Sequence, residues 1–225
     1  MKPYLIASLI GYFLGCVNPA YFFAKAKGFD IRTRGSGNAG ASNAKVTMGT
    51  KYFIICALYD SLKSAASVLI CRYLFPGVDA VDVLGGCMAV VGHCFPFYLN
   101  FKGGKGFAAY MGMILALDFK FLVIILVLGV ILTFVSNWIV TATYTVIISF
   151  PIYNAIIGNS KLTVIFLALT SLIIFLKHIP NIRKIIRKRE IGVNGKPVGW
   201  AIIKDDKFIV DELKQPEEKE EEKQD

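Results

Sequence analysis

Long runs without a charged side chain dominate this sequence and indicate the class of protein. Two examples are the runs from Phe121 to Phe134 and from Leu162 to Leu176. A soluble helix or strand alternates apolar and polar positions with a period of about 3.6 or 2, and these runs do not. A bilayer core about 30 Å thick takes about 20 helical residues per crossing. The pattern therefore predicts an all-α integral membrane protein, and the lack of alternation disfavours a transmembrane barrel.

The apolar runs also predict the number of crossings. Five are expected at Tyr4–Ala24, Tyr52–Phe75, Ala80–Tyr98, Trp138–Ile157 and Lys161–Lys177. The stretch Phe107–Phe134 is long for one crossing and short for two, and Asp118 and Lys120 lie in its middle. A charge at the bilayer centre costs about 2.5–3.5 kcal/mol, so two short helices that turn at Asp118 are favoured over one. We therefore predict a seven-helix transmembrane bundle that includes short helices.

Basic residues orient the predicted bundle in the membrane. Lys and Arg number 25 against 16 Asp and Glu, although only 18% of the residues are charged. With seven crossings, 20 of the 25 basic residues fall on one side, and the positive-inside bias places that side in the cytoplasm. We expect a multi-pass protein of the cell (plasma) membrane, with its N-terminus outside and its C-terminus inside. Lys25 and Lys27 follow the first run, which indicates a retained crossing rather than a signal peptide.

Composition divides the chain into two regions. Residues 1–190 hold the apolar runs and form the expected transmembrane domain, and residues 191–225 form a cytoplasmic extension. Its last part, Pro216–Asp225, is acidic and low in complexity, which is typical of a disordered tail. The five cysteines lie in apolar stretches without a CxxC pair, so we expect buried thiols rather than a metal site or disulfides.

Glycine-rich polar loops lie on the predicted cytoplasmic side. The first, Arg32–Asn43, reads RTRGSGNAGASN. Its glycines allow backbone amides to turn toward one point, and its arginines make that point electropositive, which suits a phosphate or another anion. The alternative is a flexible basic loop near acidic lipids.

Two further clusters lie on the same side. Phe101–Gly106 reads FKGGKG, and glycines around Lys105 just before a helix would set amides and an ammonium group against one anion. Its spacing is not that of a P-loop, and a basic turn that anchors the helix to headgroups is the alternative. The cluster Lys177–Arg183 contains His178, where the last crossing is expected to emerge.

A pair of ionisable residues lies within the second predicted crossing. Asp60 and Lys63 are three residues apart, on one face of the helix. Charged groups at that depth are costly and usually face a protein interior, so the pair is either functional or a structural ion pair.

Together the clusters favour a substrate that carries phosphate. No His, Asp and Glu cluster has metal-ligand spacing, and we expect no metal, no cofactor and no nucleic-acid partner. The sequence has no evident Ser-His-Asp set and no HxxxxD box, since Tyr98 stands five residues after His93. A covalent acyl-enzyme is therefore disfavoured.

These segments resemble the bacterial acyl-phosphate:glycerol-3-phosphate acyltransferases, small integral membrane enzymes of phospholipid synthesis. The match runs from about Gly11 to Glu190. It is carried by Gly11-Tyr12 with Gly15 and Pro19, GSGNAGASN at Gly35–Asn43, Asp60 with Lys63, Gly92-His93 with Pro96, FKGGKG at Phe101–Gly106, Phe134-Val135-Ser136, and His178 with Asn181 and Glu190.

The resemblance implies a seven-helix membrane fold with cytoplasmic Gly-rich loops and a cytoplasmic active site. It implies transfer of a fatty acyl group from acyl phosphate to the 1-hydroxyl of glycerol 3-phosphate, the first acylation of phospholipid synthesis. The products would be 1-acylglycerol 3-phosphate and phosphate. Membrane lipids would surround the protein, and an enzyme that forms acyl phosphate is a candidate partner. Because acyl phosphate has a good leaving group, the protein mainly has to supply positioning and electrostatic stabilisation.

The resemblance also implies roles for single residues. Ser36, Lys105 and His178 would be catalytic. Substrate and phosphate contacts would come from Gly37, Asn38, Ser42, Asn43, Lys45, Gly103, Gly104, Ser136 and Asn181, with support from Asp60, Lys63 and Glu190. The proton of the acceptor hydroxyl would go to His178 or to an oxygen of the donor phosphate, and the sequence leaves both routes open.

The sequence departs from the family pattern where two arginines are expected. Val46 stands where the family has an arginine that contacts phosphate, with Lys45 beside it, and Ile179 replaces the arginine after His178. A lysine does not reproduce bidentate phosphate binding. The departures favour a second hypothesis, a non-catalytic or altered-acceptor relative that binds phosphorylated lipid precursors. A third hypothesis, a small transporter, rests on Asp60 and Lys63 within the bilayer.

Overall fold

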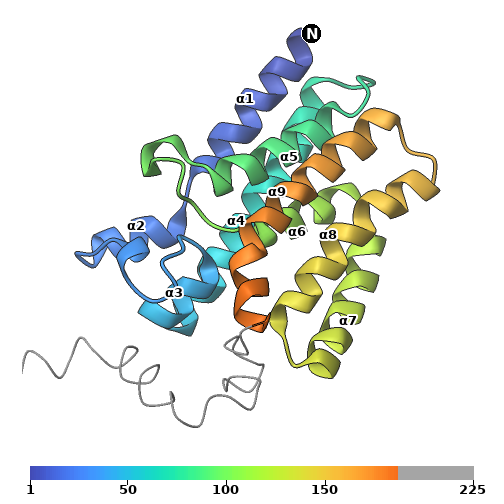
Figure 1. The fold of residues 1–225 in the computed structure, drawn as a ribbon. Coiled ribbons are helices and arrows are strands. Elements are labelled where there is room, and N and C mark those ends of the chain that lie inside the picture. Colours follow the sequence, from blue (N-terminus) through green and yellow to red (C-terminus); the bar gives the residue numbers. More distant parts are fainter. Residues whose placement is uncertain (187–225) are drawn as a thin grey trace, which may run out of the picture.

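Helices and connecting loops make up the described part of the chain (Figure 1). The computed structural model describes residues 1–186, so Glu190 and the predicted extension at 191–225 lie outside the described residues. Two 3₁₀ turns lie in the loops, η1 (Ile31–Thr33) and η2 (Phe97–Leu99). The α-helices are α1 (Lys2–Cys16), α2 (Pro19–Ala26), α3 (Ala41–Met48), α4 (Thr50–Leu74), α5 (Val81–Cys94), α6 (Phe107–Leu117), α7 (Phe119–Ser136), α8 (Ile139–Ile156) and α9 (Lys161–Ile186).

The apolar helices confirm the predicted fold class. Five segments of the described chain are long and apolar enough to cross a membrane: Lys2–Ala26, Thr50–Leu74, Val81–Leu99, Phe119–Ser136 and Lys161–Ile185. Two shorter apolar helices, α6 and most of α8, complete the predicted seven. The count of seven is approximate, because the 11 residues of α6 span only about 17 Å. Successive apolar helices run in opposite directions, so the loops before α3 and α6 lie at the end of the bundle opposite the N-terminus (Figure 1).

The first predicted crossing, Tyr4–Ala24, is not one continuous helix. Helix α1 ends at Cys16, and α2 begins at Pro19 and runs away from the α1 axis (Figure 1). Asn18 causes the break together with the proline, because its Oδ1 accepts a hydrogen bond from the Tyr21 amide (2.9 Å) and so caps α2. Proline suits the first position of a helix but not its interior. The predicted crossing therefore consists of two helices joined by a break, within the apolar segment Lys2–Ala26.

The predicted turn within Phe107–Phe134 is confirmed. Helix α6 ends at Leu117, and α7 begins one residue after Asp118. The Asp118 carboxylate caps α7 by accepting a hydrogen bond from the Phe121 amide (2.8 Å), and it accepts a second one from the Tyr153 hydroxyl (2.9 Å). The charge that would be costly inside one long crossing instead begins the next helix.

Helix α9 is longer than the predicted last crossing, Lys161–Lys177. It continues to Ile186 and contains Pro180 in its interior. His178 and Asn181 therefore lie on a helix rather than in an emerging loop. Their spacing of three residues puts them on the same side of α9.

Close backbone contacts hold the helices that carry the loops. Helix α1 packs along α5, where a Cβ added at Gly92 would overlap the Tyr12 carbonyl oxygen. Helix α4 packs along α6, where a Cβ added at Gly112 would overlap the Ser61 carbonyl oxygen. Small residues allow such close approach between membrane helices. The main buried core joins α4 to α9 through Val68, Val90, Tyr110, Met113, Phe150, Leu167 and Ile174.

Candidate active site

The part of the first glycine-rich loop between Arg34 and Gly40 is held in shape by one buried amide. Asn43, in the first turn of α3, accepts a hydrogen bond at Oδ1 from the Ser36 amide (2.8 Å). Its Nδ2 donates to the carbonyl oxygens of Ile31 (2.9 Å) and Arg34 (3.0 Å). Asn43 therefore closes the loop onto α3, and its predicted contact with a substrate phosphate stays a prediction.

This closure turns the predicted phosphate-binding residues outward. Gly35 has a φ of +57° and Gly37 a φ of +71°, in the left-handed region that favours glycine. Between them Ser36 is exposed, and Asn38 just beyond is half-buried. Ser42 and Lys45 are exposed on α3. The loop thus presents hydroxyl and amide groups to its surroundings.

Arg32 joins this region to the second glycine-rich loop, which spans Pro96–Gly106. Its guanidinium forms hydrogen bonds with both Asp30 carboxylate oxygens, including Nη2 to Oδ2 (2.6 Å), and its Nη1 donates to the Leu99 carbonyl (2.7 Å). The hydrogen bonds from Arg32 lower the pKa of Asp30 below its ordinary value. Arg34 lies with its guanidinium carbon 4.3 Å from the centre of the Phe29 ring. The charge of Arg32 is thus balanced locally by Asp30.

The second glycine-rich loop, Pro96–Gly106, folds back onto the end of α5. The Gly103 amide donates to the Cys94 carbonyl (3.1 Å), and the Gly104 amide donates to the His93 carbonyl (3.1 Å). A Cβ added at Gly104 would overlap the His93 ring, so any other residue there would displace the ring or the loop. A Cβ added at Gly103 would overlap the His93 carbonyl oxygen, so both glycines of the pair are required by close contacts with α5.

Three segments that are distant in the sequence meet around Lys105. Its Nζ donates a hydrogen bond to Oδ1 of Asn181 in α9. The first loop approaches the adjacent residue, since a Cβ added at Gly40 would lie 3.8 Å from the Gly104 Cα. His178 lies three residues before Asn181 on α9. The structure therefore brings both loops and the His178 cluster to one end of the bundle.

The orientation of the His178 ring follows from its contact with the preceding turn of α9. The side chain is buried, and its Nδ1 lies 2.9 Å from the Ile174 carbonyl oxygen. A carbonyl oxygen only accepts, so a neutral ring in this contact carries its proton on Nδ1 and has its lone pair on Nε2. The Tyr144 hydroxyl donates to the His178 carbonyl (3.1 Å) and joins α8 to this point. Nε2 is thus oriented as a proton acceptor.

Ser136 lies at the turn between α7 and α8. Its Oγ is 2.8 Å from the Thr141 hydroxyl oxygen and accepts a hydrogen bond from the Trp138 amide (3.3 Å). Thr141 precedes Tyr144 by three residues on α8, and Tyr144 reaches α9 at His178. The structure places Ser136 at the same end of the bundle, and its contact with a substrate stays a prediction.

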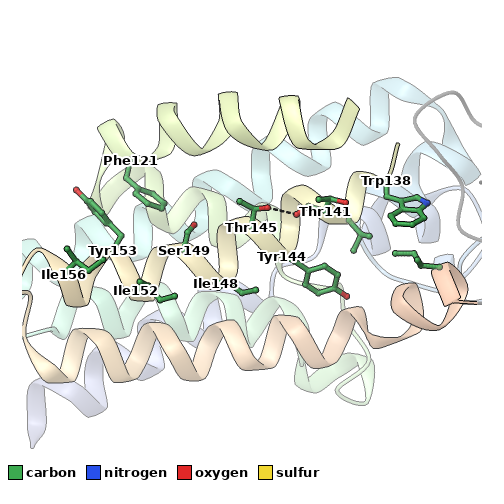
Figure 2. Close-up of a pocket in the computed structure, with 12 residues that line it drawn as sticks. Phe121, Trp138, Thr141, Tyr144, Thr145, Ile148, Ser149, Ile152, Tyr153 and Ile156 are labelled. Atoms are coloured by element: carbon green, nitrogen blue, oxygen red, sulfur yellow. Dashed lines mark hydrogen bonds between the residues drawn. The ribbon is translucent and has the colours of Figure 1, made fainter. Parts of the chain in front are cut away.

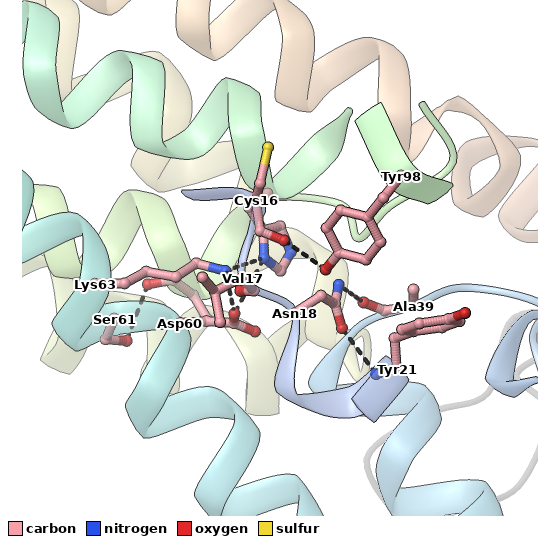
Figure 3. A network of polar contacts seen from close by, with 11 residues as sticks. Cys16, Val17, Asn18, Tyr21, Ala39, Asp60, Ser61, Lys63 and Tyr98 are labelled. Carbon is pink, nitrogen blue, oxygen red and sulfur yellow. Dashed lines mark hydrogen bonds and ion pairs between the residues drawn. The ribbon is translucent and has the colours of Figure 1, made fainter. Parts of the chain in front are cut away.

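A buried polar network lies beneath the two loops (Figure 3). Asp60 and Lys63, 1% and 6% exposed, form an ion pair of 2.7 Å on α4. Both contact Nδ1 of His93 on α5 at 3.1 Å, and Lys63 also donates to the Val17 carbonyl (2.7 Å). The sequence predicted the pair as supporting residues but gave His93 no role. The sequence signal that could have indicated a role for His93 was its position shortly before the FKGGKG segment.

An apolar groove of about 740 Å³ runs along α8 (Figure 2). Side chains from α7, α8 and the end of α9 line it, and Tyr144 joins it to the carbonyl of His178. Its lining suits a hydrocarbon chain rather than a phosphate. Within residues 1–186, no group of three His, Cys, Asp or Glu side chains is arranged to hold a metal ion.

Known proteins resemble the chain over almost all of its described length. The family described as Glycerol-3-phosphate acyltransferase matches residues 5–188. A glycerol-3-phosphate acyltransferase of Thermoanaerobacter sp. (strain X514) is 36% identical over 194 residues, which cover 85% of this chain and 96% of the relative. Glycerol-3-phosphate acyltransferase 1 of Oceanobacillus iheyensis is 33% identical, over 83% of this chain and 93% of the relative. The crystal structure of PlsY (YgiH), an integral membrane glycerol 3-phosphate acyltransferase, in its glycerol 3-phosphate form has a TM-score of 0.78 at 27% identity, over 87% of this chain and 96% of that one.

Proposed function

We propose, because this chain belongs to the glycerol-3-phosphate acyltransferase family, that it transfers a fatty acyl group from acyl phosphate to the 1-hydroxyl group of glycerol 3-phosphate. The products are 1-acylglycerol 3-phosphate and phosphate. The observation that carries the proposal is the meeting of two glycine-rich loops with α9 around Lys105. The transporter and non-catalytic alternatives give way to the family's acyltransferase activity.

The two loops support acyl phosphate as the donor. Acyl phosphate and glycerol 3-phosphate each carry a phosphate group. The phosphate of acyl phosphate is attached directly to the reacting carbonyl carbon. A thioester donor would bring no phosphate to that carbon. Two adjacent anion-binding loops therefore suit a reaction that aligns two phosphate groups better than one that aligns a single phosphate.

The proposed roles of the site residues follow from their positions and chemistry. Lys105 sets an ammonium group between the loops and α9, where it offsets the repulsion of two nearby phosphates. The exposed Ser36 hydroxyl binds and polarises one of these phosphates. Further contacts to the two phosphates and the glycerol come from Gly37, Asn38, Ser42, Asn43, Lys45, Gly103, Gly104, Ser136 and Asn181. Hydrocarbon from the acyl chain fits the apolar groove along α8.

His178 is the proposed proton acceptor. The oxygen of the acceptor 1-hydroxyl attacks the carbonyl carbon of acyl phosphate, and the bond from that carbon to the phosphate oxygen breaks. Phosphate leaves with the electron pair, and the hydroxyl proton moves to Nε2 of His178. The Nδ1 contact with the Ile174 carbonyl supports this role, because it leaves the lone pair on Nε2.

The proposed site faces the cytoplasm. Both loops and the end of α9 belong to the side that carries 20 of the 25 basic residues, so the positive-inside bias supports an external N-terminus for this proposed plasma-membrane protein. Residues 1–190 would form the acyltransferase domain and residues 191–225 a cytoplasmic extension. An enzyme that forms acyl phosphate would be a partner on the same side.

Purified protein with radiolabelled glycerol 3-phosphate tests the proposal, with acyl phosphate and acyl-CoA as separate donors. We expect labelled 1-acylglycerol 3-phosphate from acyl phosphate alone. Lys105→Ala should lower the rate at least about 100-fold, as loss of one electrostatic donor does in other enzymes. Lys102→Ala, an exposed lysine of the same loop, is the matched control and should keep most activity. Transfer from acyl-CoA alone would refute the donor assignment, and an unchanged Lys105→Ala rate would remove Lys105 from the mechanism.

One observation favours an altered acceptor as a second candidate function. Val46 is 58% exposed at the position where a phosphate-binding arginine is expected. Competition assays with other phosphorylated polyols test this candidate. Glycerol 3-phosphate as the best acceptor would exclude it.

A further inference from the structure

We propose that Asp60, Lys63 and His93 form a positioning network that holds the two glycine-rich loops in the relative placement needed to align two phosphate groups. Lys63 contacts the Val17 carbonyl, which precedes the residue that holds the first loop (Figure 3), and the His93 carbonyl accepts the Gly104 amide of the second loop. The expected effect of the network on kcat rests on the proposed function, whereas its expected effect on the distance between the loops does not. The three residues act through the loops rather than on the substrates.

Lys63 is the centre of the network because its ammonium group has three buried polar neighbours. Nζ lies 2.7 Å from Oδ1 of Asp60, 2.7 Å from the Val17 carbonyl oxygen and 3.1 Å from Nδ1 of His93. Nζ donates to the Asp60 carboxylate and the Val17 carbonyl, so one side chain contacts a carboxylate, a backbone carbonyl and an imidazole. The partners come from α4, α5 and the break after α1. Lys63 therefore fixes the mutual placement of three segments.

One arm of the network leads to the first loop. Val17 lies in the break between α1 and α2, where a continuous helix would have used its carbonyl internally. The next residue, Asn18, is fully buried, and its Nδ2 donates to the Ala39 carbonyl (2.7 Å). Ala39 lies in the first loop, directly before Gly40. The hydrogen bond from Lys63 thus fixes the position of Val17. It thereby also fixes the adjacent Asn18, whose side chain holds this loop.

The other arm leads to the second loop. Nδ1 of His93 faces Asp60 and Lys63, and the opposite edge of the ring packs on Gly104. The His93 carbonyl also accepts the Gly104 amide (3.1 Å). Lys105 follows Gly104 directly. The orientation of the His93 ring, set by the ion pair, therefore supports the residue that precedes the proposed catalytic lysine.

General stabilisation is a weaker explanation of this arrangement. A buried ion pair is often no more stabilising than well-packed apolar residues of similar volume.

The Ser67 hydroxyl donates to the Gly85 carbonyl (2.8 Å), which also joins α4 to α5 in the buried interior. That bond lies at residues remote from both loops in the sequence and contacts neither. It therefore supplies a matched control for loss of a buried contact between the same two helices.

The test compares Lys63→Met with Ser67→Ala in the full-length protein. Spin labels on cysteines at Thr33 and Lys102, which are exposed residues of the two loops, report the distance between the loops. We expect one narrow distance distribution in the otherwise unchanged protein and in Ser67→Ala, and a broadened distribution in Lys63→Met. Lys63→Met should also lower kcat about 100-fold, the scale expected for an error of about 1 Å in alignment. Ser67→Ala should keep kcat within about threefold.

His93 variants separate the two edges of the imidazole. His93→Asn can retain a polar atom near the Nδ1 position, whereas His93→Gln can retain one near the Nε2 position. We expect the asparagine variant to recover more of the narrow distance distribution than His93→Ala does.

Two results would overturn the inference. The first is a narrow distribution with unchanged kcat in Lys63→Met. The second is equal broadening in Lys63→Met and Ser67→Ala. If the unsubstituted protein transfers no acyl group from acyl phosphate, the proposed function fails, and the distance distributions still decide whether the network positions the loops.

Discussion

At the residue scale, Val46 is the clearest departure from what a phosphate site requires. Its side chain lies on α3 and borders the first loop, since a Cβ added at Gly35 would lie 3.3 Å from Val46 Cγ1. The neighbouring Lys45 ammonium lies 5.8 Å from the centre of the Phe53 ring. A guanidinium can form two parallel hydrogen bonds with phosphate, and neither valine nor a single ammonium group can. We infer that the acceptor site lacks one bidentate contact.

Val46→Arg should therefore strengthen acceptor binding. We expect KM for glycerol 3-phosphate to fall about tenfold, which corresponds to about 1.4 kcal/mol. Steady-state kinetics at saturating acyl phosphate measures this change. Val46→Lys is the control, because it adds the charge without the bidentate geometry and should give a smaller decrease. An unchanged KM in the arginine variant would show that position 46 does not reach the bound acceptor.

At the element scale, the two helix breaks use the same capping chemistry but were not equally predictable. Asp118 caps α7 and Asn18 caps α2, each by accepting a hydrogen bond from an amide three residues later. The aspartate was recognised because a charge inside a long apolar run is costly. The asparagine is neutral, and the run around it is short enough for one crossing, so local pattern alone favoured a continuous helix. Its side chain also donates to Ala39, which is 21 residues away in the sequence, and the local pattern does not show that contact.

Loss of the cap at the start of α7 should destabilise the bundle. Asp118→Ala removes the hydrogen bond to Phe121 and the acceptor of the Tyr153 hydroxyl, so we expect the free energy of unfolding to fall by about 1–2 kcal/mol. Thermal unfolding in detergent measures the change. Tyr153→Phe removes only the second bond and should cost less. Equal stability of Asp118→Ala and the unsubstituted protein would contradict the capping role.

At the scale of the whole molecule, contacts between the loops require that they share one side of the membrane. Arg32 contacts Leu99, and Lys105 contacts Asn181, so the two loops and the C-terminal part of α9 meet at one end. The ion pair between Arg72 and Asp82 (2.9 Å) joins the last turn of α4 to the first turn of α5, at the helix ends opposite the loops. The proposed site therefore occupies one membrane surface.

Labelling with a membrane-impermeant maleimide tests this arrangement in cells. The native cysteines are buried, so single cysteines at the exposed positions Thr33, Lys102 and Asp79 provide the reactive thiols. We expect Asp79→Cys to react in intact cells, and Thr33→Cys and Lys102→Cys to react only after permeabilisation. The reverse pattern would invert the proposed orientation. Reaction of Thr33→Cys and Lys102→Cys on opposite sides would contradict a shared site.

The sequence by itself determined the membrane class, the approximate set of apolar helices, the break at Asp118 and the segments that form the loops. These properties follow from the length of apolar runs, the cost of a charge in the bilayer and the conformational preferences of glycine, all of which act over a few residues. Only the tertiary structure decided that Asn43 closes its own loop, that Lys105 reaches Asn181 and that Lys63 joins Val17 to His93. The Asn43 contacts span 7 to 12 residues and depend on how the loop itself folds. The Lys105 and Lys63 contacts depend on how separate helices pack, because they join residues 30 to 76 positions apart in the sequence.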